Sequence, residues 1–182
     1  HSLSDDEKSR LVVDIGGGST EFILGQRFEP KRLESLQLGC VSYSDTFFPD
    51  GRLSQDRFWK AYDLASVEVS HIRRNFKQSH WTEGVGSSGT LQAIELIITT
   101  AGWRSEGIDS KSLKKLRKAL LKFDSVDDIS LEGLNERRRG VITAGVVIAT
   151  AIFDVLGIEV MRTSSGALRE GGIYDLMGRL RH

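Results

Sequence analysis

The fold prediction rests on the stretch Leu11-Val12-Val13-Asp14-Ile15-Gly16-Gly17-Gly18-Ser19-Thr20-Glu21-Phe22-Ile23. An apolar run typical of a buried strand contains an acid near its end, and three glycines and two hydroxyl residues follow. A second acid then opens another apolar run. Because glycine lacks a Cβ and permits positive φ, the backbone N–H groups of such a turn can converge on an anion, most often a phosphate.

The two acids that flank the glycines, Asp14 and Glu21, have the wrong charge to bind a phosphate directly. They fit a site in which a divalent cation such as Mg²⁺ lies between the carboxylates and the phosphate oxygens. We therefore predict that Asp14 and Glu21 are catalytic and metal-binding. The predicted phosphate-binding residues of this loop are Gly16, Gly17, Gly18, Ser19 and Thr20. The alternative is a glycine-rich hairpin turn with acids at its rim, because the spacing fits neither the P-loop nor the dinucleotide fingerprint.

The remaining periodicities predict an α/β domain with a five-stranded mixed sheet and flanking helices, in the order βββαβαβα. Strands are expected at 10–15, 20–25, 31–37, 81–86 and 159–163. Helices are expected at 41–47, 54–76, 89–101, 110–122, 140–156 and 168–179, with 102–135 as a helical insertion. Residues 1–10 are polar and are interpreted as a linker or a cloning remnant, and residues 11–182 as one domain.

Two further loops, 84–90 and 163–171, each follow a predicted strand and precede a predicted helix. A helix N-terminus offers free N–H groups and partial positive charge, which suit a phosphate oxygen. The phosphate-binding candidates in these loops are Ser88, Gly89, Thr90, Ser165, Gly166 and Arg169. A guanidinium such as that of Arg169 can bind phosphate through two hydrogen bonds. The alternatives are ordinary helix capping for both loops and an ion pair with Glu170 or another acid for Arg169.

The composition of the chain argues against several classes of function. The chain has 182 residues, of which 39% are apolar, with 25 basic and 25 acidic residues. A net charge of zero argues against a general nucleic-acid surface, and the lysines of the predicted helix 110–122 are interpreted as its solvated face. No apolar run reaches the length of a membrane span. The single cysteine, Cys40, fits a reducing, cytoplasmic compartment and is expected to be a small buried residue rather than a nucleophile.

Four motifs standing in order along the chain resemble those of the exopolyphosphatase/guanosine pentaphosphate phosphohydrolase (Ppx/GppA) family. They are Asp14–Glu21, Leu38-Gly39-Cys40-Val41-Ser42, Gly86-Ser87-Ser88-Gly89-Thr90 and Ser165-Gly166-Ala167-Leu168-Arg169-Glu170-Gly171. The resemblance extends from about Leu11 to the C-terminus. It implies the actin-like, ribonuclease H-like fold, with this chain as the second of two such domains. In that family the first domain, absent from this chain, carries another phosphate loop and the catalytic glutamate, and the site lies in the cleft between them.

The resemblance further implies a Mg²⁺-assisted bacterial hydrolase that releases terminal phosphate from inorganic polyphosphate or guanosine pentaphosphate, as in the stringent response. The three-glycine loop with its serine, and the residues Tyr43 and Phe47-Phe48-Pro49, look closer to the exopolyphosphatases. The implied partners are this substrate and the missing first domain, without nucleic acid or membrane, and a homodimer of the complete protein stays open. Two other interpretations are half of an actin-like kinase or ATPase and a phosphate- or nucleotide-binding sensor without turnover.

The sequence departs from the family pattern in one place. A Glu-Arg pair followed by Pro-Gly is usual there, whereas this chain has Arg137-Arg138 and Ala144-Gly145. Glu136, one residue earlier, is a candidate substitute for the missing acid. Arg138 is kept as a candidate phosphate contact, while the favoured interpretation of this charged segment is a solvated helix start.

Overall fold

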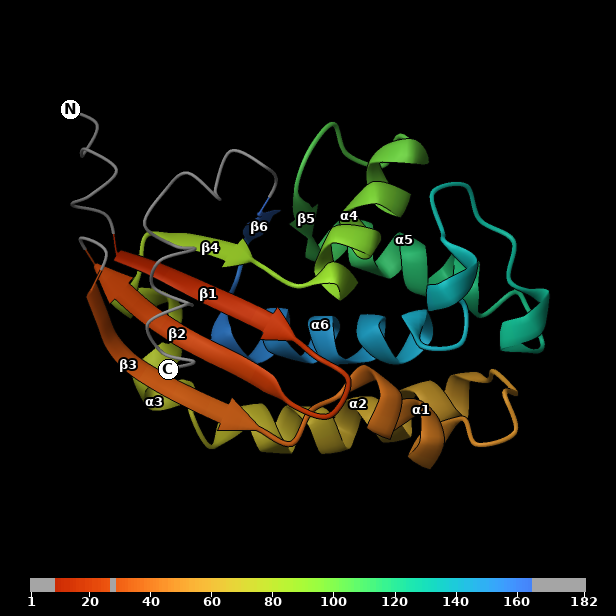
Figure 1. Ribbon diagram of the computed structural model, residues 1–182, viewed down its shortest axis with the longest axis horizontal. Helices are drawn as coiled ribbons and strands as arrows, with labels where there is room; N and C mark the ends of the chain where they lie inside the picture. The colour runs from red at the N-terminus through yellow and green to blue at the C-terminus, as the bar shows by residue number, and fades with distance from the viewer. Residues whose placement is uncertain (1–8, 27–28, 165–182) are drawn as a thin grey trace.

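The computed structural model describes residues 9–26 and 29–164, which form a six-stranded mixed sheet with helices packed against it (Figure 1). The strand order is β3-β2-β1-β4-β6-β5. Strands β1, β2 and β3 form an antiparallel meander, β4 and β6 run parallel to β1, and β5 is antiparallel to β6. The strands are β1 (Ser9–Ile15), β2 (Thr20–Gln26), β3 (Glu29–Leu36), β4 (Glu83–Gly86), β5 (Ile108–Asp109) and β6 (Val160–Thr163).

The predicted α/β class is confirmed, but the sheet has six strands instead of five. The additional strand, β5, lies within the segment 102–135 that was expected to be a helical insertion. Two residues are too few to show a period of two, so sequence patterning cannot reveal such a strand. Strand β1 begins at Ser9, inside the expected linker 1–10, and Arg10 is buried.

The helices lie close to their predicted positions, with one exception. The expected long helix 54–76 is divided into α2 and α3, because the N–H groups of His71 and Ile72 bond the carbonyls three residues back and tighten the last turn. The predicted helix 168–179 lies outside the described residues. The helices are α1 (Cys40–Phe47), α2 (Gln55–Ser70), α3 (Arg73–Phe76), α4 (Gly89–Thr100), α5 (Ser110–Leu120) and α6 (Ile142–Leu156).

Local capping signals account for several of these boundaries. The hydroxyl of Ser54 accepts a hydrogen bond from the Arg57 N–H group, as expected of an N-cap. Gly157 ends α6 in the left-handed conformation, with φ of 73°. Within the described residues, no helix is both long enough and apolar enough to cross a bilayer.

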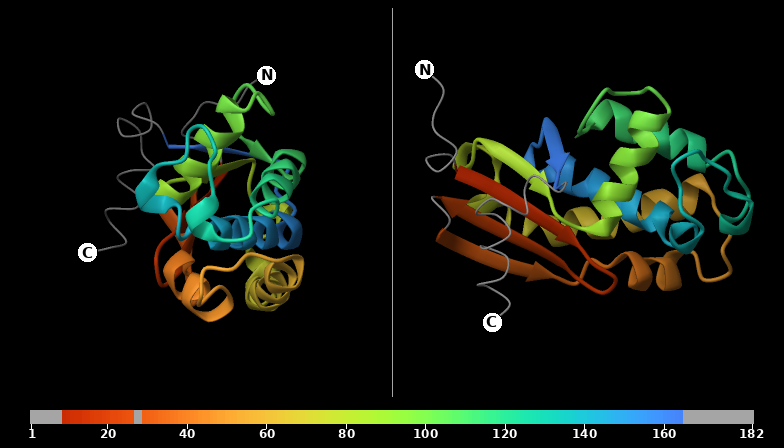
Figure 2. Two further views of the ribbon diagram at one scale, coloured as in Figure 1. Left: turned by 90° about the vertical axis from the view of Figure 1, so that its right-hand side faces the viewer. Right: turned by 45° about the horizontal axis from the view of Figure 1, so that its top comes forward.

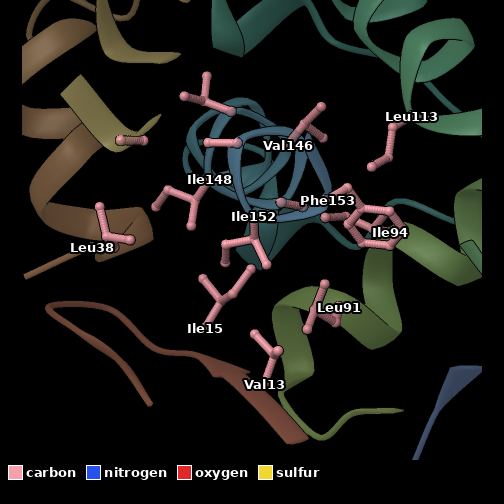
Figure 3. Packing of buried hydrophobic residues seen from close by; sticks show 14 of the residues in the cluster. Val13, Ile15, Leu38, Leu91, Ile94, Leu113, Val146, Ile148, Ile152 and Phe153 are labelled. Atoms are coloured by element: carbon pink, nitrogen blue, oxygen red, sulfur yellow. The ribbon is translucent and has the colours of Figure 1, made fainter. Parts of the chain in front are cut away.

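The core is centred on α6, which is apolar on all sides and buried along nearly its whole length. Figure 3 shows Val13 and Ile15 of β1 pointing toward this helix, with Leu91 of α4 and Leu113 of α5 around it. An apolar helix with no polar face needs neighbours all round, and the described helices together with the sheet provide them. Helix α6 therefore fixes the positions of α1, α2, α4 and α5 relative to the sheet.

Because side chains alternate along a strand, Arg10, Val12 and Asp14 point to the opposite face of the sheet from Val13 and Ile15, away from α6. On that face Arg10 Nε lies 3.1 Å from Glu83 Oε2, and Arg162 also forms an ion pair with Glu83. Burial raises the pKa of the Glu83 carboxyl, but the two guanidinium groups outweigh this effect and hold the pKa below its usual value. This cluster joins β1, β4 and β6.

Candidate phosphate-binding site

The glycine loop, residues 16–19, connects the C-terminal end of β1 to the start of β2. Ile15 pairs with Thr20, so the loop is a tight end to a hairpin. The described glycines with positive φ are Gly51, Gly102, Gly107, Gly133 and Gly157. Gly16, Gly17 and Gly18 are therefore not needed for left-handed backbone, contrary to one part of the sequence argument. Their lack of a Cβ remains the relevant property.

The close contact of this loop is with Gly39, at the N-terminus of α1. A Cβ on Gly39 would lie 2.1 Å from the Gly17 carbonyl oxygen and 2.3 Å from Gly18 Cα. Real Cβ atoms do not approach backbone so closely, so only glycine permits α1 to pack directly on the loop. Sequence reasoning placed Gly39 in a family motif but gave no physical reason for it.

The first N–H groups of α1 bind the carbonyl groups of the glycine loop. Cys40 N donates to Gly16 O at 2.9 Å, and Val41 N and Ser42 N donate to Gly17 O at 2.9 and 3.1 Å. These bonds satisfy donors that a helix N-terminus otherwise leaves free. The helix thus holds the Gly16 and Gly17 carbonyls toward itself.

This arrangement sets the direction of two amide groups. In a planar trans peptide unit the C=O and N–H groups point in opposite directions. With the Gly16 and Gly17 carbonyls held by α1, the N–H groups of Gly17 and Gly18 point away from it. Neither N–H group forms a hydrogen bond with any residue in the described part of the chain. Two neighbouring free amides with the same direction are donors that an anion could accept from together.

Asp14 and Glu21 lie beside these amides as a cross-strand pair. They are directly opposite in the β1–β2 register, which places their side chains on the same face with Cβ atoms about 5 Å apart. Both are partly exposed, and Ser19 Oγ donates to Glu21 Oε1 at 3.3 Å. Two facing carboxylates repel each other, and a divalent cation bound between them removes that repulsion.

The two carboxylates of Asp14 and Glu21 are too few to hold a metal ion by protein ligands alone, but they suit Mg²⁺. Among the described residues, no three His, Cys, Asp or Glu side chains form a group that could hold a metal ion. Mg²⁺ commonly takes one or two carboxylates and completes its octahedron with water and phosphate oxygens. Asp14 and Glu21 could supply these two ligands.

The hydroxyls of Thr20 and Thr90, predicted to bind phosphate, point into the protein. Thr20 is completely buried, and its Oγ1 donates to the Leu38 carbonyl at 2.6 Å. Thr90 is also buried, and its Oγ1 lies 3.7 Å from Cys40 Sγ. The Thr20 hydroxyl binds the segment that precedes α1, and the Thr90 hydroxyl contacts the first residue of α1, which leaves only the backbone of these two residues for a ligand. Cys40 is buried, as the sequence predicted.

The second predicted loop, 84–90, meets the first at the same edge of the sheet. Ser87 N donates to Val13 O at 3.0 Å, and Ser164 N donates to Gly86 O at 2.7 Å. The C-terminal ends of the parallel strands β1, β4 and β6 therefore come together, which is where open α/β sheets bind ligands. Ser88 caps α4 by accepting the Leu91 N–H group at 3.2 Å. Ser165, Gly166 and Arg169 lie outside the described residues.

Arg138 adds a positive charge to this edge. It ends a short 3-10 helix (Glu136–Arg138), and a Cβ on Gly89 would lie 2.1 Å from its Nη2 atom. The guanidinium thus lies over the first residue of α4 and forms no hydrogen bond or ion pair with any described residue. A cation at the positive end of a helix dipole is unfavourable unless an anion joins it.

The segment starts a short 3-10 helix with Asn135, Glu136 and Arg137 exposed, as the favoured interpretation expects, whereas Arg138 is partly buried and lies against Gly89 of α4. The contact joins segments far apart in the sequence, and no local signal could have found it. Glu136, the candidate substitute acid, has a highly exposed side chain and lies 3.9 Å from Arg139, with which it forms its ion pair.

The described residues define an α/β domain with a six-stranded mixed sheet, and the free Gly17 and Gly18 amides lie at one edge of that sheet. A solved Ppx/GppA phosphatase from Aquifex aeolicus superposes with a TM-score of 0.76 at 23% identity, covering 94% of this chain and 58% of that one. An exopolyphosphatase from Cytophaga hutchinsonii gives 0.72 at 20% identity, covering 96% of this chain and 58% of that one. At these identities the likeness shows the fold. The profile of the Ppx/GppA phosphatase family matches residues 1–180, and the chain belongs to that family.

Curated relatives correct one part of the sequence analysis. Guanosine-5'-triphosphate,3'-diphosphate pyrophosphatases of Photobacterium profundum and Aeromonas hydrophila are 38% and 41% identical over 100% and 96% of this chain. The chain covers 36% and 35% of these proteins, about a third of their length. The expected closeness to the exopolyphosphatases is therefore wrong. Tyr43 and Phe48, used for that inference, are buried in the core, and core residues report on packing rather than on substrate.

Proposed function

We propose that the complete protein hydrolyses the terminal phosphoanhydride bond of guanosine pentaphosphate, and that this domain supplies the second phosphate-binding loop of an interdomain cleft. The observation that carries the proposal is the pair of outward-pointing amides of Gly17 and Gly18 beside the facing carboxylates of Asp14 and Glu21. The names of the relatives favour the guanosine substrate, and inorganic polyphosphate remains the second candidate substrate.

Each group has a role in this proposal. The Gly17 and Gly18 amides bind nonbridging oxygens of the terminal phosphate, and Arg138 with the N-terminus of α4 binds the phosphate next to it. Asp14 and Glu21 hold Mg²⁺ or its water ligands. When bound, Mg²⁺ neutralises the charge that develops on the phosphoryl oxygens during in-line attack by water.

The glutamate that activates the water is expected from the first domain, which lies outside this chain. Half of a cleft also leaves the phosphates exposed to water and loses the stabilisation of a closed site. We expect the 182-residue chain to unfold cooperatively and bind inorganic phosphate weakly, without hydrolysing guanosine pentaphosphate, polyphosphate or ATP.

Phosphate release, measured before and after the first domain of the family is added in trans, tests this division of labour. Turnover that appears only with both domains supports the proposal. Mg²⁺-dependent turnover by the 182-residue chain alone, abolished by Asp14→Asn, would place the whole active site within this domain and overturn it.

A further inference from the structure

The hydroxyl of Ser87, which is not among the predicted phosphate-binding groups, differs from the other hydroxyls at this edge of the sheet. Thr20, Ser88 and Thr90 each have a contact for their hydroxyl within the protein. The Ser87 Oγ atom is buried as well, yet it forms no hydrogen bond with any residue that the structure describes. A buried hydroxyl in this state has lost its hydrogen bonds to water without replacement, so its retention needs an explanation.

Ser87 lies directly beside Asp14, on the same face of the sheet. Val13 pairs with Gly86 in the parallel β1–β4 ladder, and the bond from Ser87 N to Val13 O continues that ladder by one residue. Ser87 is therefore opposite Asp14, on a strand about 4.8 Å away. On the other side of Asp14, Glu21 occupies the matching place on β2. The two carboxylates and the Ser87 hydroxyl thus form one row across three strands.

The free amides of the glycine loop point to the face of the sheet that carries this row. Val13 and Ile15 point toward α6, so the residues that alternate with them point the other way. Helix α1 packs against α6 and α2, and the left view of Figure 2 shows α2, α5 and α6 on one side of the sheet. Because α1 holds the loop carbonyls on that side, the loop amides face the opposite side, where Asp14 and Ser87 lie.

Ser87 also lies between the two positions that the proposed function assigns to phosphates. The terminal phosphate is assigned to the loop amides beyond the end of β1, and the next phosphate to Gly89, where α4 begins and the Arg138 guanidinium lies. Ser87 is beside Asp14 and two residues before Gly89, so its side chain is next to the path between the two phosphates. The residue as a whole is only partly buried, and no described bond holds Oγ. Rotation about the Cα–Cβ bond can therefore bring the hydroxyl to the open side.

From this geometry we propose that Ser87 is a further substrate-binding residue, whose hydroxyl donates a hydrogen bond to the second phosphate from the end of the substrate. This role rests on the proposed function, since it requires two linked phosphates at this edge of the sheet. The Gly17 and Gly18 amides and the Arg138 guanidinium are likewise donors without a partner among the described residues. A single ligand with acceptor oxygens on two phosphates satisfies all of these donors at once.

The test compares inorganic phosphate with pyrophosphate, each titrated into the 182-residue chain with Mg²⁺ present and followed through the amide shifts of Gly17 and Gly18. Ser87→Ala should weaken pyrophosphate binding about tenfold, the order of one hydrogen bond to a charged group, and change the Kd of inorganic phosphate by less than about twofold. The matched control is Ser35→Ala, because Ser35 is exposed on β3, directly opposite Glu21 and on the far side of the carboxylates from Ser87. This control should bind both ligands like the parent chain.

Thermal unfolding separates binding from a structural role. The ligand-free Ser87→Ala chain should keep the parent melting temperature, whereas Ser88→Ala, which removes the cap of α4, should lower it by about 2–4 °C. A similar fall for Ser87→Ala, unchanged pyrophosphate binding, equal weakening of both ligands, or no pyrophosphate binding by the parent chain would each overturn the role of Ser87. These measurements need no turnover. Ser87-dependent binding without hydrolysis by the complete protein would contradict only the proposed function, and hydrolysis with parent-like binding by Ser87→Ala would contradict only the role of Ser87.

Discussion

Two loops that look alike in the sequence meet at one edge of the sheet, and they are built in different ways. The glycine loop, 16–19, has its carbonyls bound by α1 and leaves two amides pointing outward. The loop 84–90 uses Ser88 to cap α4 and Thr90 to contact Cys40, and its free cationic group, Arg138, comes from elsewhere in the chain.

The difference teaches which atoms of a Gly/Ser/Thr-rich loop are left for a ligand. The sequence predicts that Thr20, Ser88 and Thr90 bind phosphate, yet each hydroxyl contacts another group within the protein. A buried hydroxyl without a partner is costly, so packing tends to use these groups first. Backbone amides and a charge brought from a distant segment remain for phosphate.

The largest expected effect is at the carboxylates of the first loop. In the complete protein, Asp14→Asn and Glu21→Gln should each lower kcat by about 100-fold or more, because a group that holds the metal is lost. The melting temperature should change little, since both side chains lie partly exposed at the end of a hairpin. Steady-state kinetics and thermal unfolding check both statements. Glu34→Gln, an exposed position on β3, is the control. Retained activity in either site variant would show that the loop is a simple hairpin turn.

The contact between α1 and the loop should give the next largest effect. Gly39→Ala places a methyl group 2.1 Å from the Gly17 carbonyl, so the loop must move, at a cost of about 1–3 kcal/mol in stability and with loss of phosphate affinity. Gly18→Ala meets no atom within 4 Å and has no positive φ, so it should keep the parent melting temperature.

Gly17→Ala should have an effect between those of Gly39→Ala and Gly18→Ala, because its Cβ would contact Val41 Cγ2 at 3.3 Å. We expect it to weaken phosphate binding while the fold is kept. Chemical-shift changes of the Gly17 and Gly18 amides on addition of phosphate measure the binding. Equal melting temperatures for the Gly39 and Gly18 variants would argue against direct packing of α1 on the loop.

A smaller effect is expected at the second loop. Arg138→Gln should raise KM for the phosphate substrate roughly tenfold, the order of one charge-assisted hydrogen bond. Arg137→Gln, at the exposed neighbouring position of the same 3-10 helix, should leave KM unchanged. If the two variants behave alike, Arg138 is not positioned toward the ligand by its contact with Gly89.

The smallest effect is predicted for Thr90→Val. This change removes a hydroxyl that makes a weak contact with Cys40 Sγ at 3.7 Å and keeps the shape of the side chain. Stability should change by less than about 1 kcal/mol, and kcat and KM by less than about twofold. A large loss of activity with an intact fold would mean that the hydroxyl reaches substrate, and that the two loops are more alike than their geometry indicates.

Much of the fold could be predicted from local signals. The apolar run before the glycines gave β1, Ser54 marked the start of α2, and Gly157 marked the end of α6. The acids at positions 14 and 21 were identified by their places beside the glycines. The β1–β2 hairpin implied by that spacing puts them opposite each other.

Other features depended on segments that only tertiary structure brings together. Strand β5 forms because it pairs with the edge of β6, and a pattern of two residues is too short to predict a strand. The sequence alone determined that this protein has an α/β domain with an acid-flanked glycine turn, since strand periodicity, glycine chemistry and helix caps act over a few neighbouring residues. The tertiary structure decided which way the loop amides point and where Arg138 lies. Those features follow from how α1 and the 3-10 helix pack against distant segments, which no local preference specifies.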